Sequence, residues 1–383
     1  MRRNTHTVRI GDLPLGSDHP VRLQSMTNTN TLDTEATIAQ SIRIIEAGGE
    51  YVRITAPGIR EAEHLAVIKK ELHRRGYNNP LIADIHFNPK AAETAARIVE
   101  KVRINPGNYV DKKLSSLKTY TESEYAAELE IIHKRLLPLI KVCKEYGTAI
   151  RIGSNHGSLS DRIINRYGNS PQGMVESAME FLRIFEAENF NQVVLSMKAS
   201  NVRVVIESTR LLVERMAREN MLYPLHLGVT EAGEGEDGRI KSAVGIGTLL
   251  MDGIGDTIRV SLTEPPEAEI PVALNILQAC RLRMSKPEYI SCPSCGRTQF
   301  DIQTAAAKIR ERTSHLIGLK IAIMGCIVNG PGEMADADYG YVGAGPGKIT
   351  LYKQREVMKR NIPEEHAVDE LIKLIKANGD WKD

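Results

Sequence analysis

The stretch TESEYAAELEIIHKRLLPLIKVCKEYGTAIRIGSN, residues 121–155, contains one complete unit of the pattern that decides the fold. Thr121 and Glu124 form a capping box, and apolar residues then recur at every third or fourth position. Gly147 is the residue type that ends a helix in the left-handed conformation. An apolar, β-branched run begins at Ala149. The stretch therefore predicts an amphipathic helix that leads directly into a buried strand.

The same unit repeats along the first two-thirds of the chain. Eight apolar runs alternate with helical patterns, and they begin near Val21, Tyr51, Leu81, Val102, Ala149, Gln192, Leu225 and Thr257. Alternation of this kind predicts parallel strands joined by crossover helices. Eight such units match the size of a (β/α)8 barrel, which we predict for residues 1–283. Periodicity alone leaves a doubly wound open sheet as the alternative.

The pattern changes after a short basic linker that ends at Pro287. We predict that residues 284–383 form a small, separate α+β domain. Its expected elements are a helix from about Asp301 to His315, a strand from Leu319 to Met324, a hairpin-like stretch from Tyr339 to Tyr352, and a final helix from Glu364 to Ala377.

Composition limits the classes of function. A net charge of +2 with 26% charged residues gives no reason to expect nucleic acid or a membrane surface as partner. The chain has no apolar run long enough for a transmembrane helix, and no apolar segment follows its basic first residues as in a signal peptide. Five unevenly spaced cysteines are typical of a reducing compartment and a metal role. We therefore expect a cytoplasmic protein, with Cys143 and Cys280 as small buried residues.

The other three cysteines form a candidate metal centre. Cys292 and Cys295 are a Cys-x-x-Cys pair, and Cys326 follows a predicted strand. The run from Asn329 to Glu333 is expected to be a glycine loop that returns Glu333 toward Cys326. Three thiolates suit an iron–sulfur cluster or zinc, and unligated core cysteines are the third alternative.

The fourth ligand distinguishes the two kinds of metal. Glu333 would be a hard oxygen ligand that is easily displaced, which suits a reactive iron. His315 lies between Cys295 and Cys326 in sequence and would instead complete a closed Cys3His zinc site.

Cations gather where the predicted barrel strands end, which is where such barrels place their active sites. They are Arg53, Arg103, Arg151, Lys198 and Arg259. Strand alternation points them inward, and an inward charge needs a partner. Asp84 and Glu231 are the only carboxylates at the same strand ends that can pair with these cations. Any one cation could form a structural salt bridge, but five together predict an anionic ligand such as a diphosphate or a polycarboxylate.

Further polar residues follow the same strand ends. Asp84 and His86 face one side of a strand because they are two positions apart. His86 and His226 are either packed core histidines or site residues. Glu231 lies in a glycine-rich acidic loop, which is either solvated or carries a general acid or base.

These strand ends and the cysteine motifs resemble the 4-hydroxy-3-methylbut-2-enyl diphosphate synthase family of the methylerythritol phosphate route to isoprenoids, over essentially the whole chain. The matching stretches include Gln24-Ser-Met-Thr27, Ala83-Asp-Ile-His-Phe87, Arg103-Ile-Asn-Pro-Gly-Asn108, Arg151-Ile-Gly-Ser-Asn-His156 and Ser196-Met-Lys-Ala-Ser200. The resemblance implies an oxidoreductase that opens the ring of 2-C-methyl-D-erythritol 2,4-cyclodiphosphate with two electrons and eliminates water. The product is 4-hydroxy-3-methylbut-2-enyl diphosphate, and the electron donor is a flavodoxin or ferredoxin.

The resemblance also implies roles for individual residues. A [4Fe–4S] cluster is expected on Cys292, Cys295, Cys326 and Glu333. The diphosphate is expected to bind Arg53, Arg103, Arg151, Lys198 and Arg259, with Asn155 and Ser261 as hydrogen-bonding groups. His226 matches a position near the carbon skeleton of the substrate, and the expected catalytic residues are Asp84, His86, Glu231 and Glu333.

Family resemblance further implies a homodimer in which the cluster domain of one subunit covers the barrel of the other. The extra domain of longer family members is absent here, because about thirty residues separate Arg259 from Cys292.

Two other classes of function compete with the reductase. One is a non-redox barrel enzyme, such as a phosphate-ester lyase or a pterin-type transferase, with a structural zinc domain. The other is a non-catalytic iron–sulfur sensor, which would have no use for five inward cations.

Overall fold

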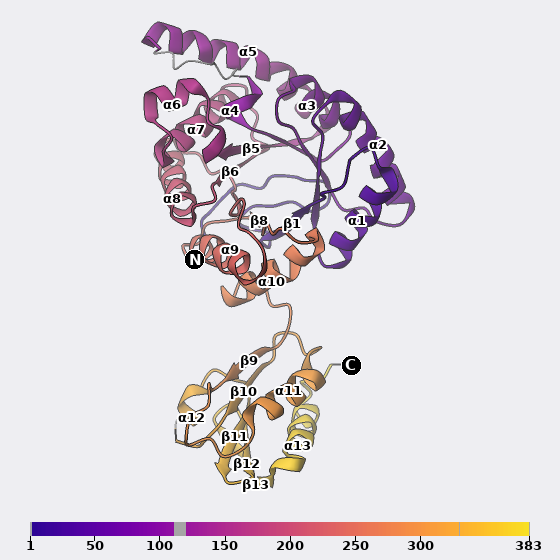
Figure 1. Ribbon diagram of the computed structural model, residues 1–383, viewed down its shortest axis with the longest axis vertical. Helices are drawn as coiled ribbons and strands as arrows, with labels where there is room; N and C mark the ends of the chain where they lie inside the picture. The colour runs from indigo at the N-terminus through magenta and orange to yellow at the C-terminus, as the bar shows by residue number, and fades with distance from the viewer. Residues whose placement is uncertain (1, 111–119, 329, 383) are drawn as a thin grey trace. The chain divides into compact units, whose positions relative to one another are not determined.

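The computed structural model describes residues 2–110, 120–328 and 330–382. The chain divides into two compact units, Met1–Arg283 and Met284–Asp383, each with its own hydrophobic core. Figure 1 shows strands surrounded by helices in the first unit, and a sheet with helices beside it in the second. No helix in the described part of the chain is long and apolar enough to cross a membrane.

The first unit is a barrel of eight parallel strands, in the order β6-β5-β4-β3-β2-β1-β8-β7. An isolated parallel bridge between Leu195 and Leu225 joins the two ends of this order. Consecutive neighbours without a reversal confirm the predicted (β/α)8 barrel over the doubly wound sheet. The strands are β1 Arg22–Met26, β2 Tyr51–Thr55, β3 Leu81–Asp84, β4 Lys101–Ile104, β5 Ala149–Asn155, β6 Val193–Lys198, β7 His226–Leu227 and β8 Thr257–Ile258.

Helices surround these strands. The predicted helices are α1 Thr34–Glu46, α2 Ile59–Arg74, α3 Pro89–Ala96, α5 Glu122–Tyr146, α7 Pro171–Ala187, α8 Val202–Arg218, α9 Gly235–Met251 and α10 Glu269–Ala279. The loops add four short helices that the sequence pattern did not predict, α4 Pro106–Tyr109, α6 Asp161–Tyr167, η1 His156–Ser158 and η2 Pro266–Ala268. Helix α5 has the predicted capping box at Thr121 and the predicted left-handed Gly147, with φ of 70°.

The barrel interior is closed at its lower end by the N-terminal segment. Val8 and Leu15 pair as an antiparallel bridge, and both are fully buried with Tyr51 and Ile82 from inside the barrel. Above this apolar floor the inward positions become charged. The fold therefore leaves one end of the barrel, where the strands finish, for a ligand.

The second unit is a five-stranded sheet in the order β13-β12-β11-β10-β9. Strands β9 and β11 run parallel to β10, and β11, β12 and β13 are antiparallel. Its elements are β9 Glu288–Ser291, α11 Ile302–Thr313, β10 Lys320–Met324, α12 Gly330–Glu333, β11 Tyr339–Gly345, β12 Lys348–Lys353, β13 Glu356–Pro363 and α13 Glu364–Ala377. The predicted hairpin is confirmed as β11 and β12, whereas β13 was not predicted.

One local prediction in this unit is wrong. Residues 330–333 form the single helical turn α12 and not an open glycine loop, while Asn329 lies outside the described residues. Pro331 has the backbone angle that the first turn of a helix needs. Met334 is fully buried, and its backbone N–H donates to the Gly330 carbonyl at 3.0 Å. These two restraints wind the segment into a turn despite its glycines.

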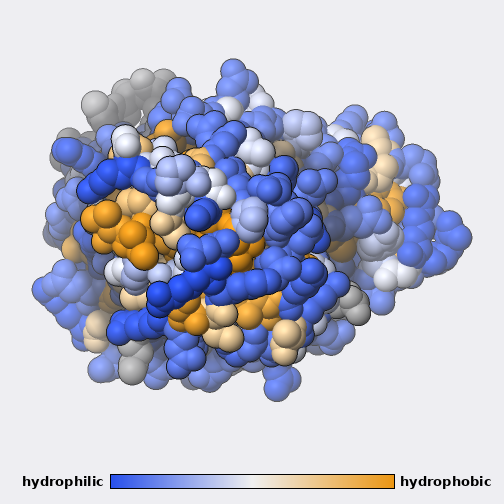
Figure 2. Space-filling model, turned by 90° about the horizontal axis from the view of Figure 1, so that it is seen from below, coloured by the Kyte–Doolittle hydropathy of each residue, from blue (hydrophilic) through white to orange (hydrophobic). Residues whose placement is uncertain are grey.

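The surface gives no sign of a large apolar face in the view of Figure 2. Hydrophobic side chains there form patches that hydrophilic side chains interrupt. Scattered exposure of this kind is normal for a folded protein in water.

Candidate active site and metal centre

The five predicted cations lie inside the barrel, close to the ends of their strands. Arg103 and Arg151 are register partners on β4 and β5, and both side chains are buried. Lys198 ends β6 and is 7% exposed. The side chains of Arg53 and Arg259 are 12% and 16% exposed. The inward direction that alternation predicted for these side chains is what the structure has.

Asp84 is the carboxylate at the centre of this group. It accepts a hydrogen bond from Arg103 Nη1 at 3.3 Å, and Arg53 Nε lies 3.8 Å from its second oxygen. His86 Nε2 lies 3.4 Å from that oxygen. Burial would raise the pKa of Asp84, but the charges of Arg53 and Arg103 outweigh it and hold this pKa well below its usual value. Asp84 is therefore ionised and fixes two of the arginines.

Arg259 has a partner that the sequence did not predict. Glu269, in the first turn of α10, accepts from Arg259 Nε at 3.1 Å and from its Nη2 at 3.2 Å. Ser25 Oγ donates to the same carboxylate at 2.7 Å. Glu231, the other carboxylate expected to pair with these cations, is exposed, and its backbone has a positive φ of 53°. Within the described residues no salt bridge joins Glu231 to the barrel cations, so the expected pairing is wrong for this residue.

Arg151 and Lys198 have no carboxylate partner among the residues that the structure describes. Arg151 Nη1 donates to Ser196 Oγ at 3.1 Å, but its Nε makes no hydrogen bond to the protein. Gly228 makes room for Lys198, because a Cβ at that position would lie 2.1 Å from Nζ. Burial, and then the charge of Arg151, lowers the pKa of Lys198 well below its usual value. These two cations are held in place without compensation.

Lys101 is a sixth buried cation that the sequence analysis missed. Its side chain is fully buried, its Nζ makes no hydrogen bond within the described residues, and it lies 4.7 Å from the ring centre of Tyr51. Burial and the charges of Arg151 and Arg53 lower its pKa well below the usual value. Lys101 lies two positions before Arg103 on one strand, so the same alternation could have identified it.

His226 lies among the cations and is 1% exposed. Neither ring nitrogen has a hydrogen-bond partner in the described part of the chain. Burial and then Lys198 and Arg151 lower the pKa of His226 well below its usual value, so the ring is neutral. A neutral ring can both donate and accept a hydrogen bond, which suits hydroxyl groups on a ligand.

Asn155 and Ser261 complete the predicted residues of the barrel. Arg103 Nη2 donates to Asn155 Oδ1 at 3.4 Å and to the Gly153 carbonyl at 3.1 Å. Ser261 is half-buried in the segment after β8. The barrel mouth thus collects an excess of positive charge, with Asp84 and Glu269 as the carboxylates paired to it, and this arrangement can bind a compact polyanion.

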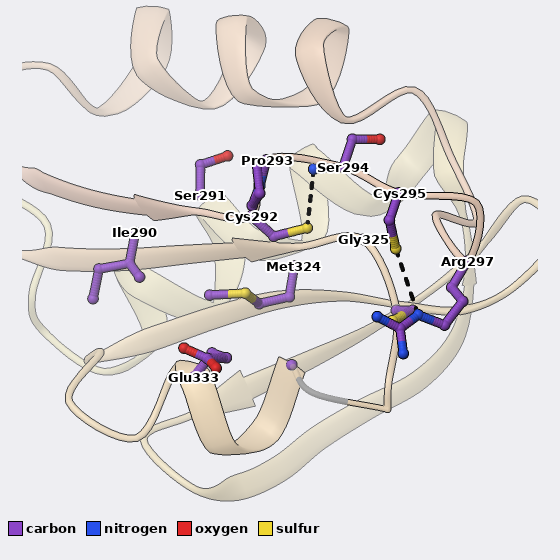
Figure 3. Close-up of a pocket in the computed structure, with 12 residues that line it drawn as sticks. Ile290, Ser291, Cys292, Pro293, Ser294, Cys295, Arg297, Met324, Gly325 and Glu333 are labelled. Carbon is purple, nitrogen blue, oxygen red and sulfur yellow. Dashed lines mark hydrogen bonds between the residues drawn. The ribbon is translucent and has the colours of Figure 1, made fainter.

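The second unit brings the predicted metal ligands to one cavity. Cys292, Cys295, Cys326 and Glu333 all line a cavity of about 350 Å³, together with the apolar side chains of Ile290 and Met324 and with Arg297. In Figure 3, Cys292 and Cys295 lie on one loop, and Glu333 lies on the short helix α12. All five cysteines of the chain are free.

Hydrogen bonds fix the loop that carries the cysteine pair. Thr298 N donates to the Cys295 carbonyl at 3.0 Å, and Cys295 N donates to Thr298 Oγ1 at 3.1 Å. Gln299 N donates to the Gly325 carbonyl at 3.0 Å, which ties this loop to the one that carries Cys326. A Cβ on Gly325 would lie 2.8 Å from Thr298 Oγ1. Glycine at this position lets the two cysteine loops approach each other.

The two candidate fourth ligands lie in different surroundings. In the described ranges no three His, Cys, Asp or Glu side chains are arranged to hold one metal ion. His315, the alternative zinc ligand, is exposed and packs against Trp381 with 4.8 Å between ring centres. It does not line the cavity, whereas Glu333 does. The cavity is thus lined by three thiols and the carboxylate of Glu333.

Comparison with known protein families gives two matches. A model of the GcpE TIM-barrel domain matches residues 5–274, and a model of the GcpE protein C-terminal domain matches residues 288–377. Both units described above are therefore covered.

Curated relatives match over the full chain. A protein of Picosynechococcus, named 4-hydroxy-3-methylbut-2-en-1-yl diphosphate synthase (ferredoxin), is 55% identical over 384 residues, which cover 100% of this chain and 94% of the relative. A protein of Parabacteroides distasonis, named 4-hydroxy-3-methylbut-2-en-1-yl diphosphate synthase (flavodoxin), is 42% identical over 602 aligned residues, which cover 99% of this chain and 98% of the relative. The second relative thus has a long segment that this chain of 383 residues lacks.

Solved structures match more weakly. Dihydropteroate synthase of Yersinia pestis superposes with a TM-score of 0.47 at 11% identity, over 73% of this chain and 100% of the other. A likeness at this level supports no inference about function.

Proposed function

This chain belongs to the GcpE family, and we infer that it catalyses the reductive ring opening and dehydration of 2-C-methyl-D-erythritol 2,4-cyclodiphosphate to 4-hydroxy-3-methylbut-2-enyl diphosphate. The reaction takes up two electrons and, counted for the free acids, two protons, and it releases one water. The chain is thus an oxidoreductase of isoprenoid biosynthesis whose electron donor is a flavodoxin or ferredoxin.

The observation that carries this proposal for the barrel is its uncompensated positive charge. Arg151 and Lys198 are buried without a carboxylate partner among the described residues, and burial of an unpaired charge costs several kcal/mol. Binding of a diphosphate would offset this cost, because its oxygens accept charge-assisted hydrogen bonds from arginine and lysine. We assign diphosphate binding to Arg53, Arg103, Arg151, Lys198 and Arg259, with Asn155 and Ser261 as further hydrogen-bonding groups.

Asp84, His86 and His226 are assigned to the carbon skeleton of the substrate. The ionised Asp84 orients His86 from 3.4 Å. Neutral His226 has both ring nitrogens available to substrate hydroxyls within the described structure. Glu231 stays our proposed acid or base. Its exposure means that it would have to meet the substrate from the loop that follows β7, after that loop adjusts.

The cysteine cavity is proposed to hold a [4Fe–4S] cluster through Cys292, Cys295, Cys326 and Glu333. The cluster would supply electrons to the substrate one at a time. Glu333 is exposed, and a single carboxylate among thiolate ligands is the most easily displaced of the four. We therefore assign Glu333 as the ligand that gives the substrate access to the cluster.

Two further features belong to the proposal. The protein is expected in the cytoplasm, because its five free cysteines suit a reducing compartment. It is also expected to be a homodimer in which the barrel of one subunit works with the cluster unit of the other. Mixing the impaired barrel variant Lys198→Met with the inactive cluster variant Cys292→Ser tests this arrangement, since mixed dimers would be more active than either variant alone. Absence of any regain after subunit exchange would contradict it.

The function itself is tested by anaerobic turnover. Protein reconstituted with iron and sulfide is expected to convert the cyclic diphosphate when reduced ferredoxin or flavodoxin is supplied, and to release one product per two electrons. The matched control is Cys292→Ser, with an intact barrel. Ring opening at equal rates by both proteins would contradict a redox mechanism and favour a hydrolytic one.

A further inference from the structure

Arg297 occupies the cysteine cavity without being one of its proposed ligands. It lines the same cavity as Cys292, Cys295 and Cys326, and its Nε donates to Cys295 Sγ at 3.5 Å (Figure 3). Its electrostatic attraction extends beyond Cys295 to Cys326 and Cys292. Among the residues that line this cavity, Arg297 is the cation.

The backbone around Arg297 is held in place. Gln299 Nε2 donates to the Arg297 carbonyl at 2.8 Å, and the two hydrogen bonds between Cys295 and Thr298 close the loop on either side. The side chain is exposed, and within the described residues no carboxylate forms a salt bridge with it. The ordinary role of an exposed arginine, a surface ion pair, therefore does not account for its position.

A positive charge beside the cysteine ligands affects the reduction potential of the site. Three thiolates and one carboxylate around a [4Fe–4S] core make the oxidised site negative, and uptake of an electron makes it more negative. A fixed positive charge and an N–H group directed at a ligand sulfur both favour the more negative state. The reduction potential of the site then rises toward that of its donor.

We propose that Arg297 is a positioning residue that sets the reduction potential of the site, by placing its guanidinium against Cys295 and stabilising the reduced state. This inference rests on the proposed function, because it requires that a cluster binds the cavity. It goes beyond the ligand set, since Arg297 is not among the residues assigned to the cluster or to the diphosphate.

The test is a redox titration followed by electron paramagnetic resonance on reconstituted Arg297→Gln and Arg297→Lys. We expect midpoint potentials in the order wild type, then Lys, then Gln, with Gln the most negative. Lysine keeps the charge but loses the planar N–H group that meets the sulfur. Arg310→Gln is the matched control. Arg310 lies on α11, where its guanidinium packs over the ring of Tyr289 outside the cavity, so its replacement should leave the potential unchanged.

Turnover gives a second readout. The Gln variant should lose rate with reduced ferredoxin but regain it with a stronger artificial reductant such as reduced methyl viologen, because only the driving force has changed. Equal potentials in wild type, Arg297→Gln and Arg310→Gln, at equal iron content, would overturn the inference. If Arg297→Gln binds no cluster, the Lys variant decides: a negative shift supports the inference and an unchanged potential overturns it. A wild-type protein without iron and sulfide would instead refute the proposed function.

Discussion

At the barrel mouth, Arg151 and Lys198 lie on strands whose register fixes them and are almost completely buried, whereas the cysteines of the second unit lie on loops around an open cavity. The barrel site is formed by folding itself, and its uncompensated charge is an electrostatic cost that the folded chain carries. The cysteine site has little such cost, because its groups are solvated until a metal binds. One region is thus organised without a ligand, and the other would be completed by the proposed cofactor.

The largest effect is expected at the cysteine site. Cys292→Ser removes one of three thiolates, so cluster content and turnover should both be lost, because serine is a poor ligand for iron in such a cluster. Absorbance near about 400 nm and iron analysis measure the first, and product formation the second. Cys280→Ser is the control, since Cys280 packs on α9 in the barrel unit and should leave both unchanged. A colourless Cys292→Ser protein with wild-type activity would contradict the account.

The next effect is expected in the stability of the barrel. Asp84→Asn leaves Arg53 and Arg103 without their shared carboxylate, and removing one partner of a buried pair costs about 3–5 kcal/mol of unfolding free energy. Chemical denaturation measures this loss. Glu71→Gln on α2 is the contrast, because Glu71 pairs with Arg74 and Arg75 at the surface, and the stability should hardly change. Equal effects of the two substitutions would show that the barrel charges are not buried as described.

Lys198→Met should separate function from stability. Loss of a charged hydrogen-bond donor to the diphosphate lowers kcat/KM by roughly 10-fold to 200-fold, from about 1.5–3 kcal/mol per charged hydrogen bond. The free energy of unfolding should rise by about 1 kcal/mol, because an unpaired buried charge is removed. Lys134→Met, on the exposed face of α5, should change neither. A variant that loses stability but keeps its affinity for inorganic pyrophosphate would contradict the diphosphate role.

The pH dependence sharpens the same comparison. The pKa of Lys198 is lowered well below its usual value, first by burial, so the folded chain binds this proton more weakly than the unfolded chain. Stability therefore rises with pH between the lowered pKa and about 10.4, the ordinary pKa of lysine. The curve of unfolding free energy against pH should be steeper in this range for wild type than for Lys198→Met. Parallel curves would mean that Lys198 is solvated.

The smallest effect is expected from Gly325→Ala. The new Cβ would lie 2.8 Å from Thr298 Oγ1 and force the two cysteine loops apart, at a cost of about 1 kcal/mol. Partial loss of iron on gel filtration should follow, with unchanged pyrophosphate binding by the barrel. Gly345→Ala on β11 is the control, because this position has open space at its Cβ and does not line the cavity. Full iron retention in Gly325→Ala would show that the loops do not need this close approach.

The repeat of strand and helix predicted the barrel because each unit carries its own signal, as in the capped helix α5 and the strand after it. Strands β7 and β8 contain only two residues each. They were predicted from the regular alternation of strands and helices along the chain and not from the length of their apolar runs. Closure between Leu195 and Leu225 joins neighbours that no local pattern links.

The candidate site was predictable where alternation alone fixes direction, as for Arg103 and Arg151. Glu269 was missed because it lies on a helix, and only the tertiary fold brings it to Arg259. The helical turn at Gly330 was missed because glycine favours loops locally. Pro331 and the burial of Met334 favour the helix instead. Sequence patterns thus predicted the residues that point into the barrel and one of their partners, Asp84, which lies on a neighbouring strand, but not Glu269.

The central claim is that a diphosphate-binding barrel and an iron–sulfur unit act together, and the most direct measurement is of the metal. Anaerobic purification followed by an absorption spectrum with iron and sulfide analysis is predicted to give a brown protein with about four irons and four sulfides per chain. Stoichiometric zinc without sulfide in the same preparation would contradict the claim, and it would leave the barrel as a non-redox phosphate-binding enzyme.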